Sequence, residues 1–272
     1  SAGASVSAEL NAALANIASA FTISGAGVGT PSPASTTTAP VVNTVNWAFA
    51  IDNALTQYLG AGQTVTAVYR ITVDDNSITR AGLDETPSSY QDVTITITGA
   101  NDAPAITVQT GNSDASAFTE TNGGLSSSGT LTVRDVDLAN TVSVAVQSVS
   151  ASGVLNGLVP TNAQLLAMLS LNPVAATPVL STSETVDQLS WSFNSGSEAF
   201  NYLAIGEVLT LNYTLRATDS SGATFDKTIG FTITGTNDAP ILLTGSGDTI
   251  QLSTGTATPT LRVAIPTTGV VA

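Results

Sequence analysis

The sequence contains no cysteine and no histidine, and each absence excludes a kind of chemistry. Without cysteine there is no disulfide framework and no thiolate chemistry. Without histidine the commonest acid–base residue of enzymes is missing. Basic residues are also scarce, because 6 Lys and Arg stand against 20 Asp and Glu, which leaves a net charge of −14. Since nucleic-acid binding needs a basic surface, nucleic acid is not an expected partner.

Long apolar runs and catalytic motifs are missing as well. No stretch reaches the roughly 18 apolar residues of a membrane span, so no membrane span is expected. The chain has no G-x-S-x-G elbow and no P-loop, and Lys227 is its only lysine. Paired carboxylates of the kind that hydrolyse glycosides stay open on sequence grounds. We nevertheless expect a protein that is not an enzyme.

What the chain does contain is a repeat. The letters TITGANDAP end at Pro104, and TITGTNDAP ends at Pro240. Aligned backwards from these endings, the two copies place Trp47 on Trp191 and Tyr58 on Tyr202. So many aligned positions show that the chain is built from two copies of one unit. Because both tryptophans occupy the same repeat position, we expect them in the core rather than as sugar-binding platforms.

The periodicity of each copy indicates strands. Residues 64–73 (TVTAVYRITV) and 208–218 (VLTLNYTLRAT) alternate apolar and polar residues with many β-branched side chains, which is typical of half-buried antiparallel strands. Residues 92–99 and 227–235 follow the same pattern, and 129–137 with 141–150 form a further pair in the second copy. Residues 8–21 instead show helical spacing and predict one short helix in the first domain. The sequence therefore predicts an all-β fold of tandem β-sandwiches.

The two copies are not equally complete. The opening of the second copy, residues 105–140, has no counterpart in the first. The end of the chain, "TPTLRVAIPTTGVV" from residue 258, lies instead over "SGTLTVRDVDLANTV", with Leu261 on Leu131 and Val263 on Val133. We therefore expect an incomplete sandwich at 1–104, a complete one at 105–240 and a tail at 241–272 that resembles the opening of a third copy.

A sandwich without its opening strands exposes an apolar groove and unpaired backbone groups. An apolar tail from another copy would cover both by strand addition. The expected polymerisation strand carries Leu261, Val263, Ile265 and Val270. Because the contact is head-to-tail, it propagates into a filament of copies of this chain. The alternative is that the sequence is a window of two periods from a longer repeat array, which would show the same offset.

The repeat resembles the VCBS repeats, the cadherin-like Ig-type modules of large bacterial surface adhesins and other secreted proteins. The resemblance rests on the "ITGxNDAP" endings, on "GTLTVRDVD" and on the run from Trp191 to "ATDSSG", and it covers essentially the whole chain. It implies Ig/cadherin-like sandwiches, an extracellular or cell-surface location, and a role in extension, linkage or adhesion.

The resemblance also implies Ca²⁺ at the junction between domains, which suits its preference for six to eight oxygen ligands. The implied ligands at the first junction are Asn101, Asp102, Asp135, Asp137 and Asp219, with Glu120 as an extra candidate. Asn237 and Asp238 would form the second linker, and Asp74 and Asp75 would match the later aspartate in the following copy. An alternative interpretation is that Asn and Asp before proline only shape turns.

The tail departs from this pattern. Ile265 and Thr267 stand where the second copy has Asp135 and Asp137. The calcium site is therefore expected between the two domains, and strand donation is expected to hold the joint between copies. The predicted function is a structural subunit of an extracellular filament. The alternatives are a stalk segment of a long calcium-dependent adhesin and a module that binds glycans, other cells or surfaces.

Overall fold

The computed structural model describes residues 6–25, 44–74, 88–237, 252–253 and 260–261. The chain divides into two compact units, residues 1–236 and 237–272. The larger unit holds both repeat copies, and the smaller unit holds the tail. Val263, Ile265 and Val270 of the predicted polymerisation strand lie outside the described residues. Among the residues that the structure describes, no helix has the length and apolar character needed to cross a membrane.

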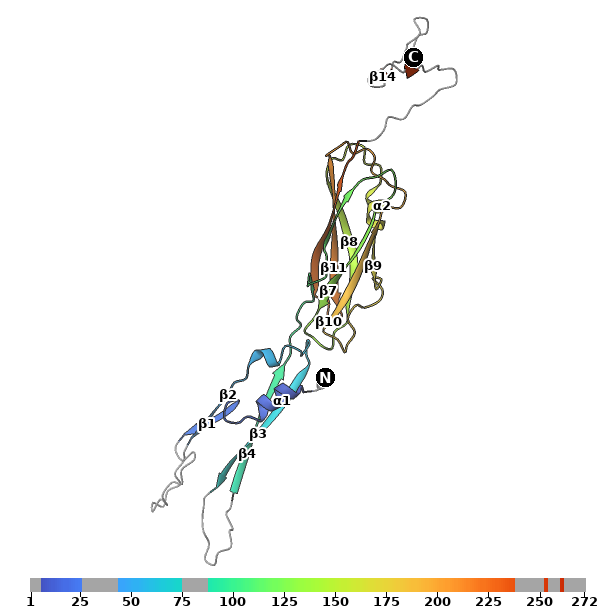
Figure 1. Cartoon of the computed structure of the whole chain (residues 1–272). Helices are drawn as coiled ribbons and strands as arrows, with labels where there is room; N and C mark the ends of the chain where they lie inside the picture. Colours follow the sequence, from blue (N-terminus) through green and yellow to red (C-terminus); the bar gives the residue numbers. More distant parts are fainter. Residues whose placement is uncertain (1–5, 26–43, 75–87, 238–251, 254–259, 262–272) are drawn as a thin grey trace, which may run out of the picture. The chain divides into compact units, whose positions relative to one another are not determined.

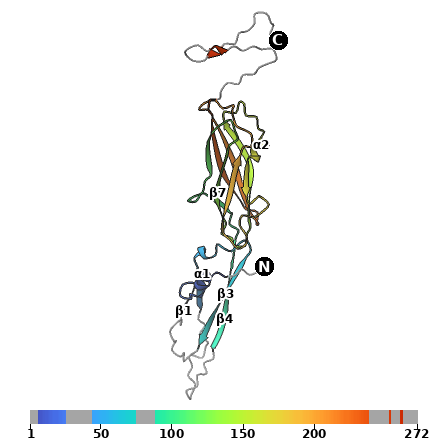
Figure 2. The same cartoon turned by 45° about the vertical axis from the view of Figure 1, so that its right-hand side comes forward.

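The second copy is a sandwich of two four-stranded sheets (Figures 1 and 2). One sheet has the order β5-β7-β10-β9, with bounds Ala105–Thr107, Ser126–Arg134, Val186–Asn194 and Leu169–Asn172. The other has the order β6-β12-β11-β8, with bounds Ala115–Thr119, Thr224–Thr234, Val208–Asp219 and Val142–Gly153. Every strand pair is antiparallel except β6 and β12, which run parallel. The predicted all-β sandwich fold is confirmed.

The core between the two sheets is apolar and contains a group of packed aromatic side chains. Trp191 and Phe193 on β10 pack against Tyr213 on β11 and Phe231 on β12, and all four side chains are at most 2% exposed. The rings of Phe193 and Phe231 stack with centroids 4.5 Å apart, across the two sheets. Burial alternates along β11, as the sequence pattern predicts for a strand with one face in the core. Apolar burial therefore holds the two sheets together.

A glycine on the neighbouring strand makes room for Trp191. Gly129 on β7 lies directly opposite Trp191 in the ladder. A Cβ added at Gly129 would lie 2.5 Å from the indole ring, closer than side-chain atoms approach. The indole Nε1 donates a hydrogen bond to the Ser113 carbonyl oxygen at 2.7 Å, which satisfies the one polar atom of this buried side chain. The burial of Trp191 thus depends on β7.

The first copy forms two separate two-stranded sheets with one helix beside them (Figure 1). Its elements are α1 (Ala8–Ala15), β1 (Phe21–Gly25), β2 (Val45–Phe49), the 3₁₀ turn η1 (Asn53–Leu55), β3 (Thr64–Asp74) and β4 (Ser88–Thr98). Strand β1 pairs with β2 and β3 pairs with β4, both antiparallel. The predicted helix is present but short, because the chain leaves it at Asn16, and Ile17 beyond it is 68% exposed.

The helix is repeated in the second copy, where the sequence periodicity predicts none. Helix α2 (Asn162–Ala167) begins with a capping box, in which Thr161 and Gln164 satisfy each other's backbone N–H groups. The Tyr213 hydroxyl donates to the Leu165 carbonyl oxygen of this helix at 2.6 Å. In the first copy the Tyr69 hydroxyl donates to the Leu14 carbonyl oxygen of α1 at 2.9 Å. Both copies therefore tie a helix to the same tyrosine position.

These contacts identify which strands correspond. The ring centroids of Phe49 on β2 and Tyr69 on β3 lie 6.1 Å apart, and those of Phe193 on β10 and Tyr213 on β11 lie 6.4 Å apart. Strands β1 and β2 thus correspond to β9 and β10, and β3 and β4 correspond to β11 and β12. Among the described residues, the first copy has no counterpart of β5, β6, β7 or β8. In the smaller unit, β13 (Leu252–Ser253) and β14 (Thr260–Leu261) pair antiparallel with each other.

Candidate functional site

The linker before the second domain is held by a cluster of acidic and amide side chains, here called the linker cluster: Asn101, Asp102, Asp135, Asp137, Asn140 and Asp219. The Asn101 Nδ2 donates to Asp219 Oδ2 at 2.8 Å. The Asp102 backbone N–H donates to Asp137 Oδ2 at 2.8 Å. Side chains far apart in the sequence therefore meet where the chain enters the second sandwich.

Asp135 and Asp137 follow the end of β7 and are the most buried members of the cluster. Asp135 is 3% exposed and Asp137 is 0% exposed. The Asp137 backbone N–H donates to Asp135 Oδ1 at 3.0 Å, which folds the chain into a tight turn. The second oxygen of each carboxyl group, Asp135 Oδ2 and Asp137 Oδ1, is buried without a hydrogen-bond partner. Buried polar atoms are almost always satisfied, so two unpartnered carboxylate oxygens in one cluster are unusual.

Asp219 reaches the cluster from the end of β11. Its Oδ1 accepts hydrogen bonds from the backbone N–H groups of Ser221 at 3.0 Å and Ala223 at 2.8 Å, which fixes the turn before β12. Its Oδ2 faces the linker through Asn101. Asp219 is 5% exposed, so this carboxylate is also held largely away from water.

Asn140 is a member that sequence reasoning missed. Its Nδ2 donates to Asn101 Oδ1 at 2.8 Å and to Asp137 Oδ2 at 3.3 Å. Its Oδ1 accepts from the hydroxyls of Ser220 and Ser221 at 3.2 and 3.3 Å. Asn140 thus joins the linker to the loops after β7 and β11. The available signal was its position three residues after Asp137 in the same acidic loop.

The electrostatics of the cluster are unfavourable for bare carboxylates. Burial raises the pKa of Asp135, and the nearby charges of Asp137, Asp219 and Asp102 raise it further, against a backbone hydrogen bond that lowers it. Burial also raises the pKa of Asp137, with added repulsion from Asp102 and Asp219. None of the ion pairs found among the described residues includes these groups; they are Arg70–Asp92, Arg216–Asp226 and Lys227–Asp114.

The donor set fits a hard cation in its chemistry. Carboxylate and amide oxygens are the ligands that Ca²⁺ prefers, and two of the carboxylate oxygens are buried and unpartnered. In the described part of the chain, however, no three His, Cys, Asp or Glu side chains converge closely enough to enclose a metal ion. Several of these oxygens accept hydrogen bonds from Asn101, Asn140 and the linker backbone instead.

Glu120 lies apart from the linker cluster. It follows β6, and its Oε1 accepts hydrogen bonds from the Thr236 N–H at 2.9 Å and the Thr236 hydroxyl at 2.6 Å. The Glu120 N–H donates to the Thr234 carbonyl oxygen at the end of β12, whereas Asp219 precedes the start of β12. Glu120 is 1% exposed. It therefore belongs to the end of the sandwich that leads into the second linker.

The remaining predicted metal ligands are placed only in part. Asp74 is the last residue of β3, and Asp75 lies outside the described residues. Asn237 is exposed, and Asp238 lies outside the described residues. The structure therefore gathers Asn101, Asp102, Asp135, Asp137 and Asp219 of the predicted set.

The first domain presents open sheet edges. In the second domain β7 covers one edge of β10, β6 covers one edge of β12, and β8 covers the other edge of β11. The corresponding edges of β2, β4 and β3 have no neighbouring strand among the described residues. Each edge therefore presents backbone N–H and C=O groups that another strand can pair with.

Side chains at equivalent positions are also more exposed in the first domain than in the second. Trp47 on β2 is 47% exposed, whereas Trp191 at the same repeat position is 2% exposed. Val45 is 37% exposed against 0% for Leu189. The prediction that both tryptophans are core residues is therefore wrong for Trp47. Its own strand is present, but no counterpart of β7 among the described residues covers it.

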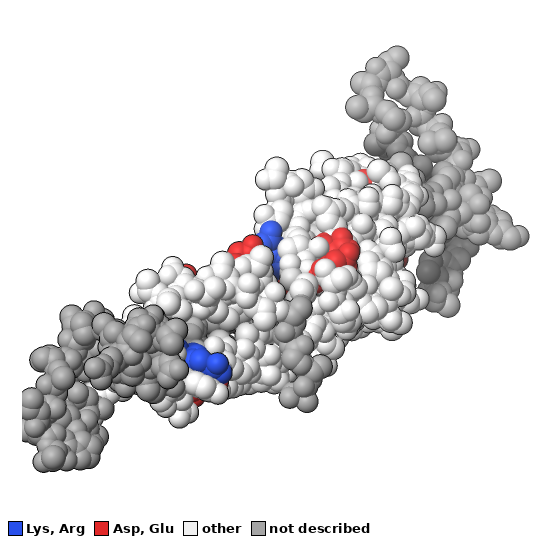
Figure 3. All heavy atoms as spheres, turned by 90° about the horizontal axis from the view of Figure 1, so that it is seen from below, with Lys and Arg blue, Asp and Glu red and all other residues white. Residues whose placement is uncertain are grey.

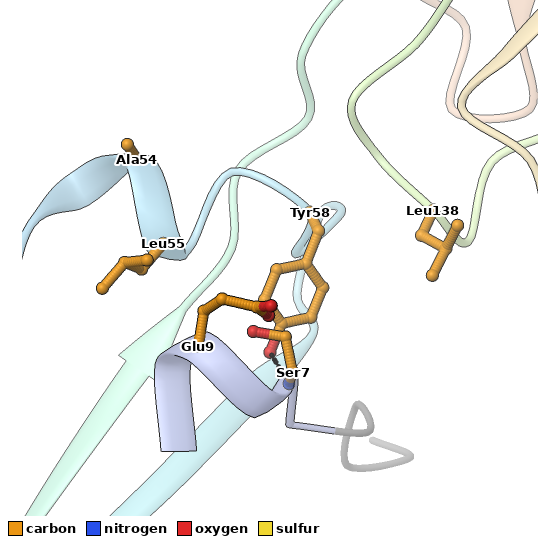
Figure 4. Close-up of a pocket in the computed structure, with 6 residues that line it drawn as sticks. All are labelled: Ser7, Glu9, Ala54, Leu55, Tyr58 and Leu138. Carbon is orange, nitrogen blue, oxygen red and sulfur yellow. Dashed lines mark hydrogen bonds between the residues drawn. The ribbon is translucent and has the colours of Figure 1, made fainter. Parts of the chain in front are cut away.

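A shallow hollow of about 380 Å³ lies beside α1 (Figure 4). Its lining residues are Ser7, Glu9, Ala54, Leu55, Tyr58 and Leu138. The Ser7 N–H donates to the Tyr58 hydroxyl at 3.3 Å, which ties the start of α1 to the turn after η1. The lining is mostly apolar, with Glu9 as its one titratable carboxylate.

Charged side chains are sparse on the molecular surface. The face seen in Figure 3 shows acidic and basic residues only in small separate groups on a largely uncharged background. This agrees with the 10% of charged residues in the sequence.

No family model and no curated protein matches the chain. Among solved structures, the PapD-like domain 7 of human CEP192 is 10% identical, with a TM-score of 0.32 over 51% of this chain and 89% of that chain. The CooA pilin subunit of enterotoxigenic Escherichia coli is 14% identical, with a TM-score of 0.32 over 51% and 100%. Cadherin-like domains 1 to 4 of zebrafish RET are 12% identical, with a TM-score of 0.24 over 62% and 34%. None of these likenesses is close enough to assign a function.

Proposed function

We propose that this chain is a structural subunit of an extracellular filament, in which the tail of one copy completes the first domain of the next. The observation that carries the proposal is the pair of equivalent tryptophans. Trp191 is buried beneath β7, whereas Trp47 is 47% exposed beside an open edge. The first domain repeats strands β9 to β12 of the second, and among the described residues it lacks the strands that cover them there.

The tail has the sequence that this cover requires. Residues 258–263 read TPTLRV, and the residues of β7 that cover Trp191 and Leu189 read SGTLTV. Leu261 and Val263 fall on Leu131 and Val133, which are both 0% exposed in the second domain. A strand of this pattern places its apolar side chains on one face, toward the core. The tail therefore matches the missing element in both pattern and register.

The energetics favour such an association. Covering Trp47, Val45 and the donated Leu261 removes apolar surface from water, at about 25 cal/mol for each Å². The donated strand also pairs backbone groups along the edge of β2, where each hydrogen bond adds roughly 0.5–1.5 kcal/mol. Donation from a second copy is a head-to-tail contact, which continues from copy to copy into a filament.

Calcium is the second part of the proposal. The linker cluster would hold one Ca²⁺ through oxygens of Asn101, Asp102, Asp135, Asp137 and Asp219. The two unpartnered oxygens of Asp135 and Asp137 support this assignment. Bound Ca²⁺ would offset the mutual repulsion of the carboxylates and fix the linker against the second domain. A stiff linker transmits tension along a filament without letting the domains swing.

The same arrangement would serve a stalk segment of a long adhesin. In that case the part of the longer array on the N-terminal side would supply the opening strands of the first domain, and the linker cluster would stiffen every junction alike. The hydrogen bonds of Asn101 and Asp102 to the second domain favour either role equally. The two functions differ in whether separate copies associate.

The test uses a chain truncated after Pro240 together with a synthetic peptide of residues 241–272, followed by isothermal titration calorimetry. We expect binding of one peptide per chain. A peptide with Leu261→Asp and Val263→Asp, which has the same length and an interrupted apolar face, should bind at least tenfold more weakly. Absence of binding by the unmodified peptide would contradict strand donation and leave the stalk function.

A further inference from the structure

We infer that the tail binds the first domain as two strands, one on each sheet: Leu252–Ser253 parallel to β4, and Thr260–Leu261 antiparallel to β2. This inference rests on the proposed function and specifies how the donated segment lies. A two-strand donor joins both sheets of the acceptor, whereas a single strand would extend only one of them.

The second domain provides the template. Its strands β6 and β7 follow each other in the chain but lie in different sheets. Strand β6 runs parallel to β12, with Phe118 opposite Ile233. Strand β7 runs antiparallel to β10, with Leu131 opposite Leu189. One continuous segment, residues 115–134, therefore closes both sheets at once.

The tail resembles this segment in sequence and, like it, contains two strands. Residues 248–253 read DTIQLS and lie over 114–119, DASAFT, which places Leu252 on Phe118. Thr260 and Leu261 lie on Thr130 and Leu131. Both tail segments are strands, β13 and β14. In the smaller unit they pair with each other, so docking would exchange this short pairing for two longer ladders.

The chain between the two strands is long enough for the crossing. Fully extended, residues 254–259 span up to about 20 Å. Packed sheets lie about 10 Å apart. The tail can therefore reach from the β4 sheet to the β2 sheet without distortion.

The acceptor side has a matching place for each strand. Ile97 on β4 pairs with Val65, as Ile233 pairs with Leu209 in the second domain, so Ile97 would face Leu252. In the second domain the Phe118 ring lies 5.4 Å from that of Phe193, whose counterpart Phe49 is only partly buried. Leu252 would thus fill the space above Phe49, where Phe118 lies in the complete sandwich.

On the β2 side, the orientation of Trp47 differs from that of Trp191. The tail carries Pro259 where β7 has Gly129. Since a Cβ at that position would collide with an indole placed as in Trp191, Trp47 must lie differently. Trp47 stacks on Phe21 with ring centroids 5.6 Å apart, whereas Trp191 meets Phe231 edge-on. The stack on Phe21 suits an incoming Pro259.

The test uses cysteine cross-linking, for which the chain is suited because it contains no cysteine. Full-length chains carry one cysteine pair each: Val45→Cys with Leu261→Cys for the β2 edge, or Ile97→Cys with Leu252→Cys for the β4 edge. Matched controls shift one partner to the opposite face, with Asn46→Cys and Thr96→Cys. After mild oxidation we expect both register pairs to form covalent ladders on non-reducing gels, at least tenfold more than the controls.

The outcomes separate the two proposals. Filaments that cross-link through Val45 and Leu261 but not through Ile97 and Leu252 would overturn two-strand donation and leave the filament function intact. Chains that form neither filaments nor ladders would overturn both. Cross-links confined to single chains would show that the tail folds back on its own first domain, which also overturns donation between copies.

A measurement on the unmodified chain tests the inference even if the cysteine variants fail to fold. Hydrogen–deuterium exchange compares the filament with the chain truncated after Pro240. We expect added amide protection in both β2 and β4, because each gains a neighbouring strand. Protection in β2 with none in β4 would contradict the second donated strand.

Discussion

Trp47 and Trp191 occupy the same position in two copies of one repeat, yet Trp47 is 47% exposed and Trp191 is 2% exposed. The difference lies in the neighbouring strands, because β7 with Gly129 opposite Trp191 covers the second and no described strand covers the first. Under the proposed function, the open edge beside Trp47 is the acceptor for a donated strand that resembles β7 in sequence.

The first prediction concerns Trp47 as a reporter of assembly. Covering the indole moves it from water into an apolar environment, so tryptophan emission should shift to shorter wavelength and acrylamide quenching should fall as filaments form. Trp191, already buried, provides a constant background. A Trp47→Phe chain should show no such change. An unchanged emission spectrum in filaments of the unmodified chain would mean that Trp47 lies outside the joint.

The second prediction concerns the linker cluster. Asp137→Asn removes a buried carboxylate and should weaken Ca²⁺ binding at least about tenfold, since even residues that only support metal ligands cost that much. Calcium should raise the melting temperature of the unmodified chain and raise it less in the variant. The control is Asp187→Asn, an exposed aspartate on β10. Equal calcium affinity in both variants would remove Asp137 from the ligand set.

The third prediction concerns pH in the absence of calcium. Burial and neighbouring charges raise the pKa of Asp135 and of Asp137 above the ordinary 3.8. The folded chain therefore holds these protons to higher pH than the unfolded chain does. The two carboxyl groups therefore contribute to the free energy of unfolding at low pH. This contribution is lost as the pH rises from the ordinary pKa through the raised pKa values of the folded chain.

Urea unfolding in EDTA across this range measures the effect. The loss of unfolding free energy with rising pH should disappear when calcium is present. It should shrink in a chain with Asp135→Asn and Asp137→Asn, which carries no charge at these positions. A decline of equal size in that chain would assign the pH dependence to other groups.

The fourth prediction tests the packing beneath β7. Gly129→Ala places a Cβ 2.5 Å from the Trp191 ring and should destabilise the second domain by about 1–3 kcal/mol, as overpacking of a core does. Gly123→Ala is the matched control, because its nearest neighbour atom, Thr121 Oγ1, lies 4.0 Å away. Chemical denaturation of both variants gives the comparison. Equal stability would show that the indole can shift without cost.

The strands were predictable where the pattern is local. Alternation along residues 208–218 and 227–235 indicated β11 and β12, and their burial follows it. Helix α2 was not predicted, because six residues carry too little periodicity. The Thr161 and Gln164 pair of its capping box was the available signal. Short helices are set by their caps and by contacts such as that of Tyr213, which sequence periodicity does not reveal.

The candidate site was predictable in composition and not in arrangement. The resemblance to the repeat family groups Asn101, Asp102, Asp135, Asp137 and Asp219 as ligands of one site, and the structure brings them together in space. Asn140 was missed because its role depends on the fold of two loops. The exposure of Trp47 could not be read from its own strand either, since it depends on a partner strand distant in sequence.

The most direct measurement is negative-stain electron microscopy of the purified full-length chain beside a version truncated after Pro240, both in calcium. Strand donation predicts thin filaments from the full chain and single particles from the truncated one. Filaments of equal abundance from both chains, or single particles from both, would contradict the claim that the tail of one copy completes the first domain of the next.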